Sequence, residues 1–423
     1  VDIDDENLKS CANITYIDAP HKDIQLDLSL DKIHFNNLNL VKTDKEEELS
    51  LKAIAQLRGK DFKHLYGNIE FNDINLQTKE NNYSLKDIII NAQKQENETS
   101  LYTINSEILT ASIEGQASLA DIVANFTNQL SHHLPILVKK QNIPATDFTY
   151  EITVKDAPVL HSLTDTKFAL KKPVRMFGNL SSDNEQMSLN IDAPSVSYNE
   201  KDYDDIALVC NTTPDNMNVH AIASTYKESD DEEIPSSSTK LDLTADIHNN
   251  IIYGDMYINT AGRNNITMQL LPVIQFSDSL GSTKTDITLR KSNAVINDTT
   301  WTISPSRISL YQQSLECDQV MFANDNTNSF LSINGRASES PSDSLVATLK
   351  DLEIKYILTL VNFNVVHFAG KASGQAIFNN FMAGGTPNIH ANLSVENLSI
   401  QEGPLGNANI TANWDEKIEG ISV

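Results

Sequence analysis

Apolar and polar residues alternate one by one along most of this sequence, and this alternation constrains the fold more than any other feature. In segment 24–30, for example, polar residues separate four apolar ones: Ile24, Leu26, Leu28 and Leu30. Because successive side chains of a β-strand point to opposite faces, such a segment forms a strand with one apolar and one polar face. The pattern recurs at 49–57, 148–154, 241–247 and 389–395. Turn signals such as Asn36-Asn37 and Asn249-Asn250 separate many of these segments, which predicts an antiparallel meander.

The alternation also predicts details of this meander. About one strand for every 11 to 13 residues would give roughly 33 to 38 strands. In the segment 69–76 the alternation changes phase at Asp73, which predicts a β-bulge at that position. Helices repeated between the strands, which a doubly wound α/β fold requires, are not visible. The sequence therefore predicts an all-β fold.

The composition limits the partners that the protein can have. The chain of 423 residues carries 32 Lys and Arg against 57 Asp and Glu, which gives a net charge of −25. Such a charge argues against binding to nucleic acids and against docking onto anionic membrane surfaces. With only 15 Gly and 13 Pro, the chain is not a flexible low-complexity polymer either.

The acidic segment Tyr226–Lys240 predicts a solvent-exposed loop. It contains the acidic run Asp230–Glu233, which is followed by Pro235 and three serines. A chain of this length would ordinarily form two or three domains, although large all-β folds often form a single one. Because alternating strands of the same character stand on both sides of the loop, we expect one elongated β-rich domain over residues 1–423.

One segment, 118–134, has a clear helical pattern. Ser118 is a suitable N-cap, Asp121 follows three residues later, and Pro135 ends the helix. One face of this helix is expected to be apolar and to contain Leu119, Ile122, Val123, Phe126 and Leu130. Two shorter helical segments are expected at 157–163 and 352–363.

The sequence contains no catalytic or ligand-binding motif. It has no HExxH zinc motif, no GxxxxGK[ST] phosphate loop, no GxSxG nucleophile elbow and no GxGxxG after a strand. His132 and His133 are adjacent, whereas two histidines that bind one metal from a helix stand four residues apart. Cys11, Cys210 and Cys317 lie far apart and form no CxxC pair. We therefore expect no catalytic residue, no metal and no cofactor.

No segment is apolar enough to form a transmembrane helix. The most apolar run, Tyr356–Ala369, is too short to span a bilayer, and polar residues such as Asn362 and His367 interrupt it. The sequence begins at Val1 without an initiator Met or a signal peptide. We therefore expect it to be an internal segment of a larger protein whose membrane anchor lies elsewhere.

Several phrases of the sequence, taken in order, are similar to those of a known family. Val295–Ile308 places Trp301 on a strand before a Pro-Ser turn, and Phe330–Ser338 and Phe368–Gly374 are strands that end in Gly-x-x-Ser or Gly-x-x-Ser-Gly. Pro387–Val395 follows as a further strand. This order resembles the repeating middle part of the TamB/AsmA-like envelope proteins of the Bacteroidetes type. The resemblance is strongest over 288–423 and extends to 100–200, where the helix 118–134 precedes a strand.

The resemblance implies a fold, a location and a function. The fold would be a long antiparallel sheet rolled into an elongated half-pipe, often called a β-taco, with a few short helices. Members of the family are linked to phospholipid movement between the inner and outer membranes and, for the TamB branch, to assembly of outer-membrane barrel proteins. The chain would thus be part of a non-enzymatic periplasmic protein anchored in the inner membrane. Its lipid-binding groove would be lined by Ile152, Val154, Leu189, Ile191, Ile303, Ile333, Ile389, Leu393 and Val395.

Two other functions are compatible with the alternation. It shows that each strand buries one face but not what covers that face, so two sheets could also close on each other in a β-sandwich. A β-sandwich or β-solenoid would favour a binding or adhesion module, and such a module would expose a cluster of aromatic residues. A polysaccharide-acting enzyme on a β-helix would need a fixed short repeat, which the sequence lacks.

Overall fold

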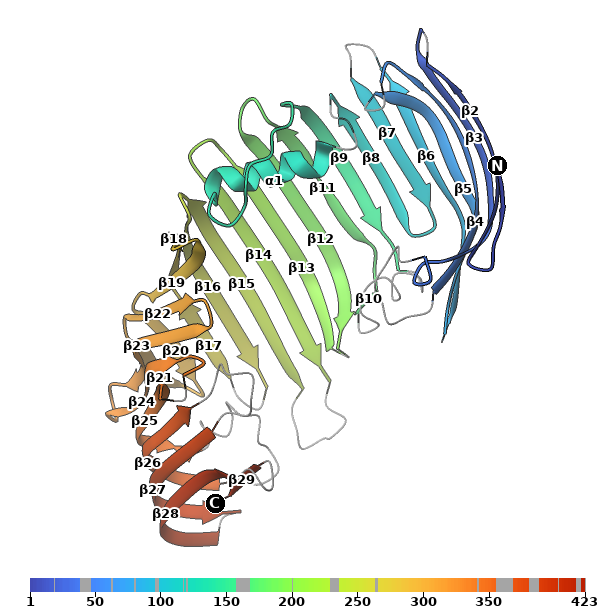
Figure 1. Ribbon diagram of the computed structural model, residues 1–423. Helices are drawn as coiled ribbons and strands as arrows, with labels where there is room; N and C mark the ends of the chain where they lie inside the picture. The colour runs from blue at the N-terminus through green and yellow to red at the C-terminus, as the bar shows by residue number, and fades with distance from the viewer. Residues whose placement is uncertain are drawn as a thin grey trace. The chain divides into compact units, whose positions relative to one another are not determined.

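The computed structural model describes the chain except for residues 19, 39–46, 62–63, 80, 96–98, 117, 119–120, 157–167, 200, 229–235, 263–264, 341, 355–367, 380–387, 402, 416–419 and 423. The described residues are almost entirely antiparallel β-sheet, with 29 strands and one α-helix (Figure 1). The all-β fold predicted from the alternation is therefore confirmed. The number of strands is lower than the expected 33 to 38, because many strands are 11 to 14 residues long.

The described residues form two compact units. Unit 1 comprises Val1–His133 and Val138–Tyr226, and unit 2 comprises Leu134–Leu137 and Lys227–Val423. We expected one domain, and the boundary between the units falls at the start of the acidic segment Tyr226–Lys240. The strands on both sides extend into this segment, and its residues 229–235 lie outside the described part of the chain.

Unit 1 contains an antiparallel meander. Each strand from β1 to β9 pairs with the next one in sequence, and β9 pairs with β11, because the short β10 pairs with the end of β12. Strands β11, β12, β13 and β14 then pair in order. The strands are Asp2–Asp4 (β1), Leu8–Ile17 (β2), Lys22–His34 (β3), Glu47–Gly59 (β4), Leu65–Thr78 (β5), Asn82–Lys94 (β6), Ser100–Ser106 (β7), Leu109–Gly115 (β8), Asp147–Val154 (β9), Phe168–Leu170 (β10), Val174–Ser181 (β11), Gln186–Tyr198 (β12), Lys201–Thr212 (β13) and Met217–Lys227 (β14).

Unit 2 is also a meander. Its strands are Ser237–His248 (β15), Ile251–Ala261 (β16), Ile266–Leu270 (β17), Pro272–Ser279 (β18), Ser282–Leu289 (β19), Ser292–Ile296 (β20), Thr299–Ile303 (β21), Ser306–Tyr311 (β22), Ser314–Asn324 (β23), Ser329–Ala337 (β24), Ser344–Glu353 (β25), Phe368–Asn379 (β26), Asn388–Ile400 (β27), Gly403–Asp415 (β28) and Gly420–Ser422 (β29). Leu352, expected to start a helix, lies in β25, and the rest of that expected helix, like the one at 157–163, falls largely or wholly outside the described residues.

Three long strands of unit 2 are each broken in the middle. The breaks lie at Leu271 between β17 and β18, at 290–291 between β19 and β20, and at 304–305 between β21 and β22. Pro305 lies within one of these breaks and Pro272 directly follows another, and a proline has no N–H for the ladder. The Arg290 guanidinium donates hydrogen bonds to the carbonyl oxygens of Leu271 and Gly254, both at 3.4 Å, and so bridges the interrupted ladder.

The β-bulge predicted in the segment 69–76 is confirmed. The register between β4 and β5 shifts between Ser50 and Lys52, and Asp73 on the opposite strand has a φ of 52°. Lys52 Nζ donates a hydrogen bond of 2.8 Å to the Asp73 carboxylate. An extra residue in one strand changes which side chains face the core, which explains the phase change in the sequence.

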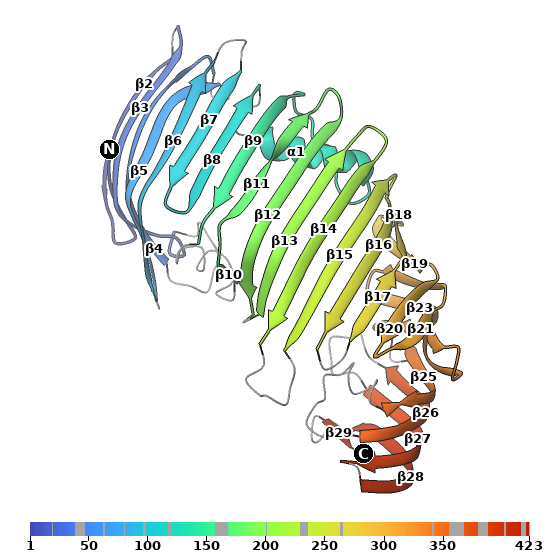
Figure 2. The same cartoon turned by 180° about the vertical axis from the view of Figure 1, so that it is seen from behind.

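The helix α1, Ile122–His133, lies within the segment 118–134 in which a helix was expected. It crosses one end of strands β9 to β13 on a single face of the sheet, and the view from behind shows the strands in front of it (Figures 1 and 2). Phe126 of the predicted apolar face packs against the sheet, and Leu119 lies outside the described residues, but the rest of the buried side differs from the expectation. Val123, predicted to belong to the buried apolar stripe, is 73% exposed, whereas the polar residues Asn125, Gln129 and His133 are buried. Asn125 accepts a hydrogen bond from the Ser182 hydroxyl in the turn after β11, so that at this position the helix buries a polar contact.

Candidate functional site

One face of unit 1 carries an unbroken row of apolar side chains, which we call the central row. Each member lies directly opposite the next one on the neighbouring strand. From β2 to β14 the central row consists of Ile14, Leu26, Ala55, Ile69, Ile90, Ile104, Ala111, Ile152, Met176, Ile191, Leu208 and Ala221. Eleven strand spacings of about 4.8 Å make it roughly 50 Å long along the sheet.

The neighbouring row on the same face is also apolar, whereas the opposite face is mostly polar. The neighbouring row contains Tyr16, Ile24, Leu57, Gly67, Ala92, Tyr102, Ile113, Tyr150, Gly178, Leu189, Cys210 and Val219. The row between these two, on the opposite face, contains Thr15, Gln25, Gln56, Asn68, Asn91, Thr103, Ser112, Glu151, Phe177, Asn190, Val209 and His220. Unit 1 is thus amphipathic across its whole width.

On strands β11 to β13, the apolar face of unit 1 is covered at both ends and more open between them. Met187, at the end of β12 next to α1, is 4% exposed, and Ala193, near β10, is 5% exposed. Between them on the same strand, Leu189 and Ile191 are only partly buried. The same holds for Met176 on β11 and Leu208 on β13. An open apolar band therefore follows the central row across these strands, whereas the central-row residue Ala55 on β4 is buried.

Tyr150 crosses from β9 to β12 over a glycine. Its hydroxyl donates a hydrogen bond of 3.0 Å to the Ser188 carbonyl, and it passes over Gly178 on the intervening strand β11. A Cβ atom on Gly178 would lie 2.8 Å from the Tyr150 hydroxyl and 2.0 Å from the Ser188 oxygen, so that only glycine fits. Burial raises the pKa of Tyr150 to about 12. The ring therefore stays neutral and forms part of the apolar face.

Unit 2 has apolar rows of the same kind. One runs across ten strands through Ile247, Ile252, Ile274, Ile287, Ile308, Cys317, Gly335, Leu345, Phe378 and Ile389. A second runs through Ile303, Phe322, Leu331, Leu349, Gly374, Leu393 and Ile410. Trp301 stacks on Phe322 with ring centroids 4.8 Å apart and packs in one cluster with Leu349 and Leu352. This part of the unit 2 face is filled by its own side chains.

The opposite face of unit 2 is polar and carries a cross-strand charge cluster. Asp286 on β19 accepts hydrogen bonds from Arg307, at 2.8 Å, and from Ser309, and its other oxygen lies 3.0 Å from Lys284 Nζ. Burial acts to raise the pKa of Asp286, but the hydrogen bonds from Ser309, Arg307 and Lys284 outweigh it and lower the pKa to about 2. The carboxylate therefore stays charged at neutral pH and keeps this face hydrophilic.

The nine residues predicted to line a groove all lie on the apolar faces. Ile152 and Ile191 belong to the central row, Leu189 to the row beside it, and Val154 stands two residues from Ile152 on the same strand. In unit 2, Ile303 and Leu393 share one row, Ile389 lies in the other, and Ile333 and Val395 stand two residues from row members. Seven of the nine are partly exposed, whereas Ile303 and Val395 are 8% and 2% exposed. Their role in lipid binding stays a prediction.

Some members of the central row were not predicted from the sequence, because the alternation around them is blurred. Each of three central-row residues is followed directly by an apolar residue on the other face: Met176 by Phe177, Leu208 by Val209 and Ala221 by Ile222. The alternation of apolar and polar residues is therefore blurred there. Phe177 and Ile222 are exposed on the polar face. The number of residues between paired strands, which sets the register, would have been the signal that identifies them.

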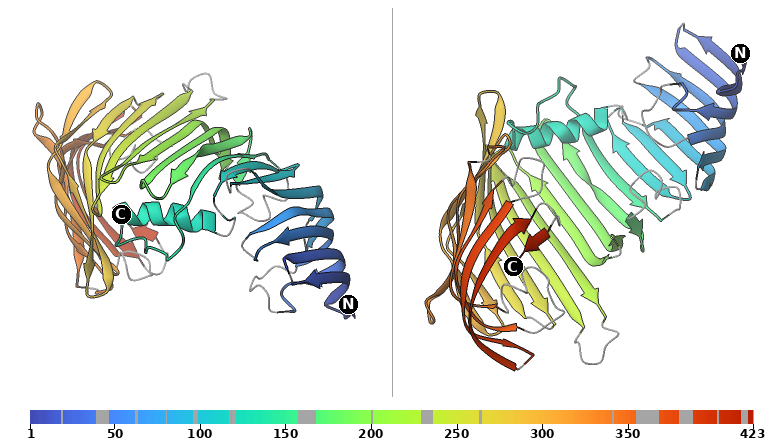
Figure 3. Two further views of the ribbon diagram at one scale, coloured as in Figure 1. Left: turned by 90° about the horizontal axis from the view of Figure 1, so that it is seen from above. Right: turned by 60° about the horizontal axis from the view of Figure 1, so that its bottom comes forward.

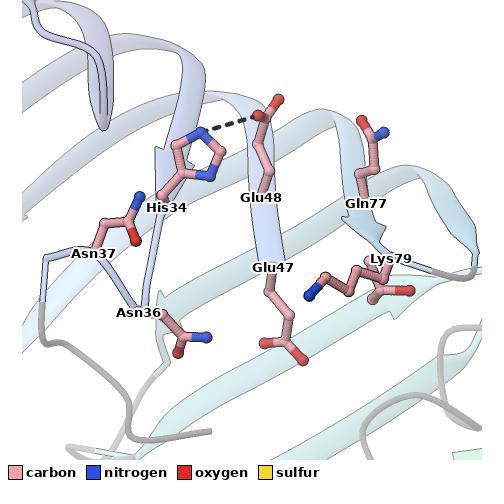
Figure 4. Close-up of a pocket in the computed structure, with 8 residues that line it drawn as sticks. His34, Asn36, Asn37, Glu47, Glu48, Gln77 and Lys79 are labelled. Carbon is pink, nitrogen blue, oxygen red and sulfur yellow. Dashed lines mark ion pairs between the residues drawn. The ribbon is translucent and has the colours of Figure 1, made fainter. Parts of the chain in front are cut away.

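A separate polar hollow of about 300 Å³ lies at the ends of β3, β4 and β5 (Figure 4). His34 Nε2 on β3 is 3.3 Å from the carboxylate of Glu48, its direct partner on β4. The hollow is lined by His34, Asn36, Asn37, Glu47, Glu48, Gln77, Thr78 and Lys79. Because these side chains are polar or charged, the hollow is not suited to an acyl chain, and the apolar faces remain the candidate site.

Within the described ranges, no group of His, Cys, Asp or Glu side chains is arranged to hold a metal ion. Cys11 is exposed and Cys210 and Cys317 are buried, all as free thiols, and burial raises the pKa of the two buried ones. In that same part of the chain, no helix has both the length and the apolarity that a membrane crossing requires.

Comparison of the chain with protein-family models, with curated proteins and with solved structures finds no match.

Proposed function

We propose that the apolar faces of this protein bind the acyl chains of phospholipid, and that the protein is a non-enzymatic periplasmic bridge along which lipid moves between the inner and outer membranes. The observation that carries the proposal is the central row. It crosses twelve strands without a single polar or charged side chain, and much of it is only partly buried.

Continuity of the row is what lipid movement requires. A polar or charged group in the path of an acyl chain would lose its hydration as the chain passes, at a cost of about 1–3 kcal/mol or more. The central row contains no such barrier, whereas the row between it and the neighbouring apolar row, on the opposite face, contains amides, hydroxyls and Glu151. Contiguous exposed apolar surface of this kind is uncommon on soluble proteins and marks a binding surface.

The acidic character of the chain indicates which part of a phospholipid is recognised. With a net charge of −25, the protein does not attract anionic headgroups. Recognition would therefore rest on the acyl chains, which contact the apolar face, while the headgroups stay in water. This mode of binding does not discriminate between headgroups.

The resemblance to the TamB/AsmA-like envelope proteins supports the same proposal and adds the location. It suggests a periplasmic protein anchored in the inner membrane, with phospholipid and outer-membrane barrel proteins as partners. Unfolded barrel strands are a second candidate cargo, because they also present alternating apolar side chains. The alternative, a binding or adhesion module on a β-sandwich or β-solenoid, has less support, because each unit contains one meander of consecutive strands.

The proposal can be tested by mapping where an acyl chain contacts the protein. The protein is incubated with a palmitate analogue that carries a photoreactive diazirine at the end of its chain, and is then irradiated and digested. Mass spectrometry is expected to find the label on members of the central row such as Ile104, Ile152 and Ile191, and not on opposite-face residues such as Thr103 or Glu151. Equal labelling of both faces would contradict the proposal.

A further inference from the structure

The helix α1 covers one end of the apolar face of unit 1. Beneath and beside it, Phe148, Leu180, Met187 and Met217 are between 1% and 4% exposed, and they lie on β9, β11, β12 and β14. Phe126 of the helix packs edge-on against Phe148 and Tyr150, with ring centroids 5.7 and 5.2 Å apart. Figure 3 shows the helix along the ends of these strands.

The covered residues continue the open apolar band. Phe148 stands two residues before Tyr150 and four before Ile152 on β9, and Met187 stands two before Leu189 and four before Ile191 on β12. Residues two apart on a strand face the same way and are separated by about 7 Å. Removal of α1 would therefore widen the open band by one row, which consists of Phe148, Leu180, Met187 and Met217 with Thr212 of β13 as its one polar member. Large, flexible apolar side chains of this kind accommodate an acyl chain.

Hydrogen bonds connect α1 to two turns of the sheet. The Ser182 hydroxyl, in the turn after β11, donates a hydrogen bond of 2.9 Å to Asn125. His132 Nε2 lies 2.8 Å from the Pro214 carbonyl, and its Nδ1 lies 3.5 Å from the Glu185 carboxylate. These partners belong to the turns β11–β12 and β13–β14. These polar contacts therefore connect α1 to the turns, and Phe126 carries the aromatic contact with the face itself.

The composition of the buried side of α1 favours reversible binding. Asn125, Gln129 and His133 are between 2% and 5% exposed, whereas Val123 points to solvent. When a helix leaves a sheet, buried polar groups exchange their hydrogen bonds with the protein for hydrogen bonds with water, whereas buried apolar groups lose their contacts without such compensation. A helix that buries this many polar groups is therefore less costly to detach than one with an apolar stripe.

We infer that α1 is a displaceable lid: it occupies part of the acyl-binding face of unit 1 and gives way when acyl chains bind there. The inference rests on the proposed function, because it names what regulates access to that same face. With the lid in place, the face beside the central row is closed at this end. With the lid displaced, an acyl chain takes the position of Phe126 against Phe148 and Tyr150.

A disulfide that locks the lid tests this inference. Asn125 and Ser182 are replaced together by Cys in a Cys11→Ser background, because their side chains meet in the structure and the two remaining thiols are buried. The photoreactive palmitate is then used on the oxidised and the reduced protein. Oxidation is expected to lower labelling at Met187 and Met217 about tenfold and to leave labelling at Ile104 unchanged. Equal labelling of Met187 in both states would overturn the inference.

A weakened lid gives the opposite change and does not depend on the disulfide. Phe126→Ala removes the aromatic contact and is expected to raise labelling at Met187, whereas Val123→Ala, a truncation on the exposed side of the same helix, is the matched control and leaves it unchanged. Unchanged labelling in Phe126→Ala would overturn the lid. Labelling of Ile104 but never of Met187 would overturn the lid and keep the proposed function, and no labelling of either residue would overturn both.

Discussion

Replacing Ile191 with Asp is expected to remove acyl-chain binding from the open band of unit 1. Ile191 lies at the middle of the band, directly opposite Met176 on one side and Leu208 on the other. A carboxylate placed there would have to lose its hydration when an acyl chain covers it. Because Ile191 is only partly buried, the carboxylate keeps some contact with water, and we expect a cost of about 1.4–2.8 kcal/mol, which corresponds to a roughly 10- to 100-fold loss of affinity.

The loss of affinity is measured as the concentration of photoreactive palmitate that half-saturates labelling of Met176 and Leu208. The matched control is Ile222→Asp, because Ile222 is 36% exposed on the opposite face, next to the central-row residue Ala221. This control introduces the same charge and is expected to leave labelling unchanged. If both variants bind palmitate as the natural protein does, lipid does not pass this level of the sheet along the central row.

Replacing Gly178 with Ala is expected to cause a large loss of stability in unit 1 from the addition of a single methyl group. The added Cβ would lie 2.0 Å from the Ser188 carbonyl oxygen and 2.8 Å from the Tyr150 hydroxyl, and the backbone oxygen cannot move without breaking the ladder between β11 and β12. Overpacking of this kind costs about 1–3 kcal/mol or more. The strands β11 and β12 have to separate locally, and the tyrosine hydroxyl has to move as well.

Amide hydrogen exchange of β9, β11 and β12 measures this loss locally, which matters because a chain with two units need not unfold in one step. Exchange is expected to accelerate in these strands. Gly403→Ala is a suitable control, since its Cβ would have one close neighbour, the Ile400 oxygen at 3.2 Å. Tyr150→Phe separates the hydrogen bond from the packing and is expected to cost about 1 kcal/mol. Exchange as slow in Gly178→Ala as in the control would show that the sheet tolerates a side chain here.

The alternation predicted the fold class and the two faces, because the side-chain period of a strand is a local property. Ile152, Leu189 and Ile191 were placed on the apolar side from their own strands alone, and the bulge at Asp73 was visible as a change of phase. These features need no information about partners. They follow from the geometry of a single extended segment.

Features that depend on pairing or on tertiary contacts could not be predicted. The central row exists only because the register of each hairpin places one apolar residue opposite the next, and a shift of one residue would interrupt it. The buried side of α1 was predicted as apolar from its periodicity, yet Val123 is exposed, because the turns around Ser182 and Pro214 bind polar groups of the helix. The burial of Ile303 and Val395 likewise depends on the surroundings of these residues in unit 2 and not on their own strands.

The most direct test of lipid binding is native mass spectrometry, combined with lipid extraction, on the protein purified without detergent. The apolar faces, if they bind acyl chains as proposed, are expected to retain phospholipid or fatty acid in several copies per protein, and extraction identifies the species. A ligand-free protein would contradict the account. It would mean that the apolar faces are closed by the protein itself, and a binding or structural module would then be the better description.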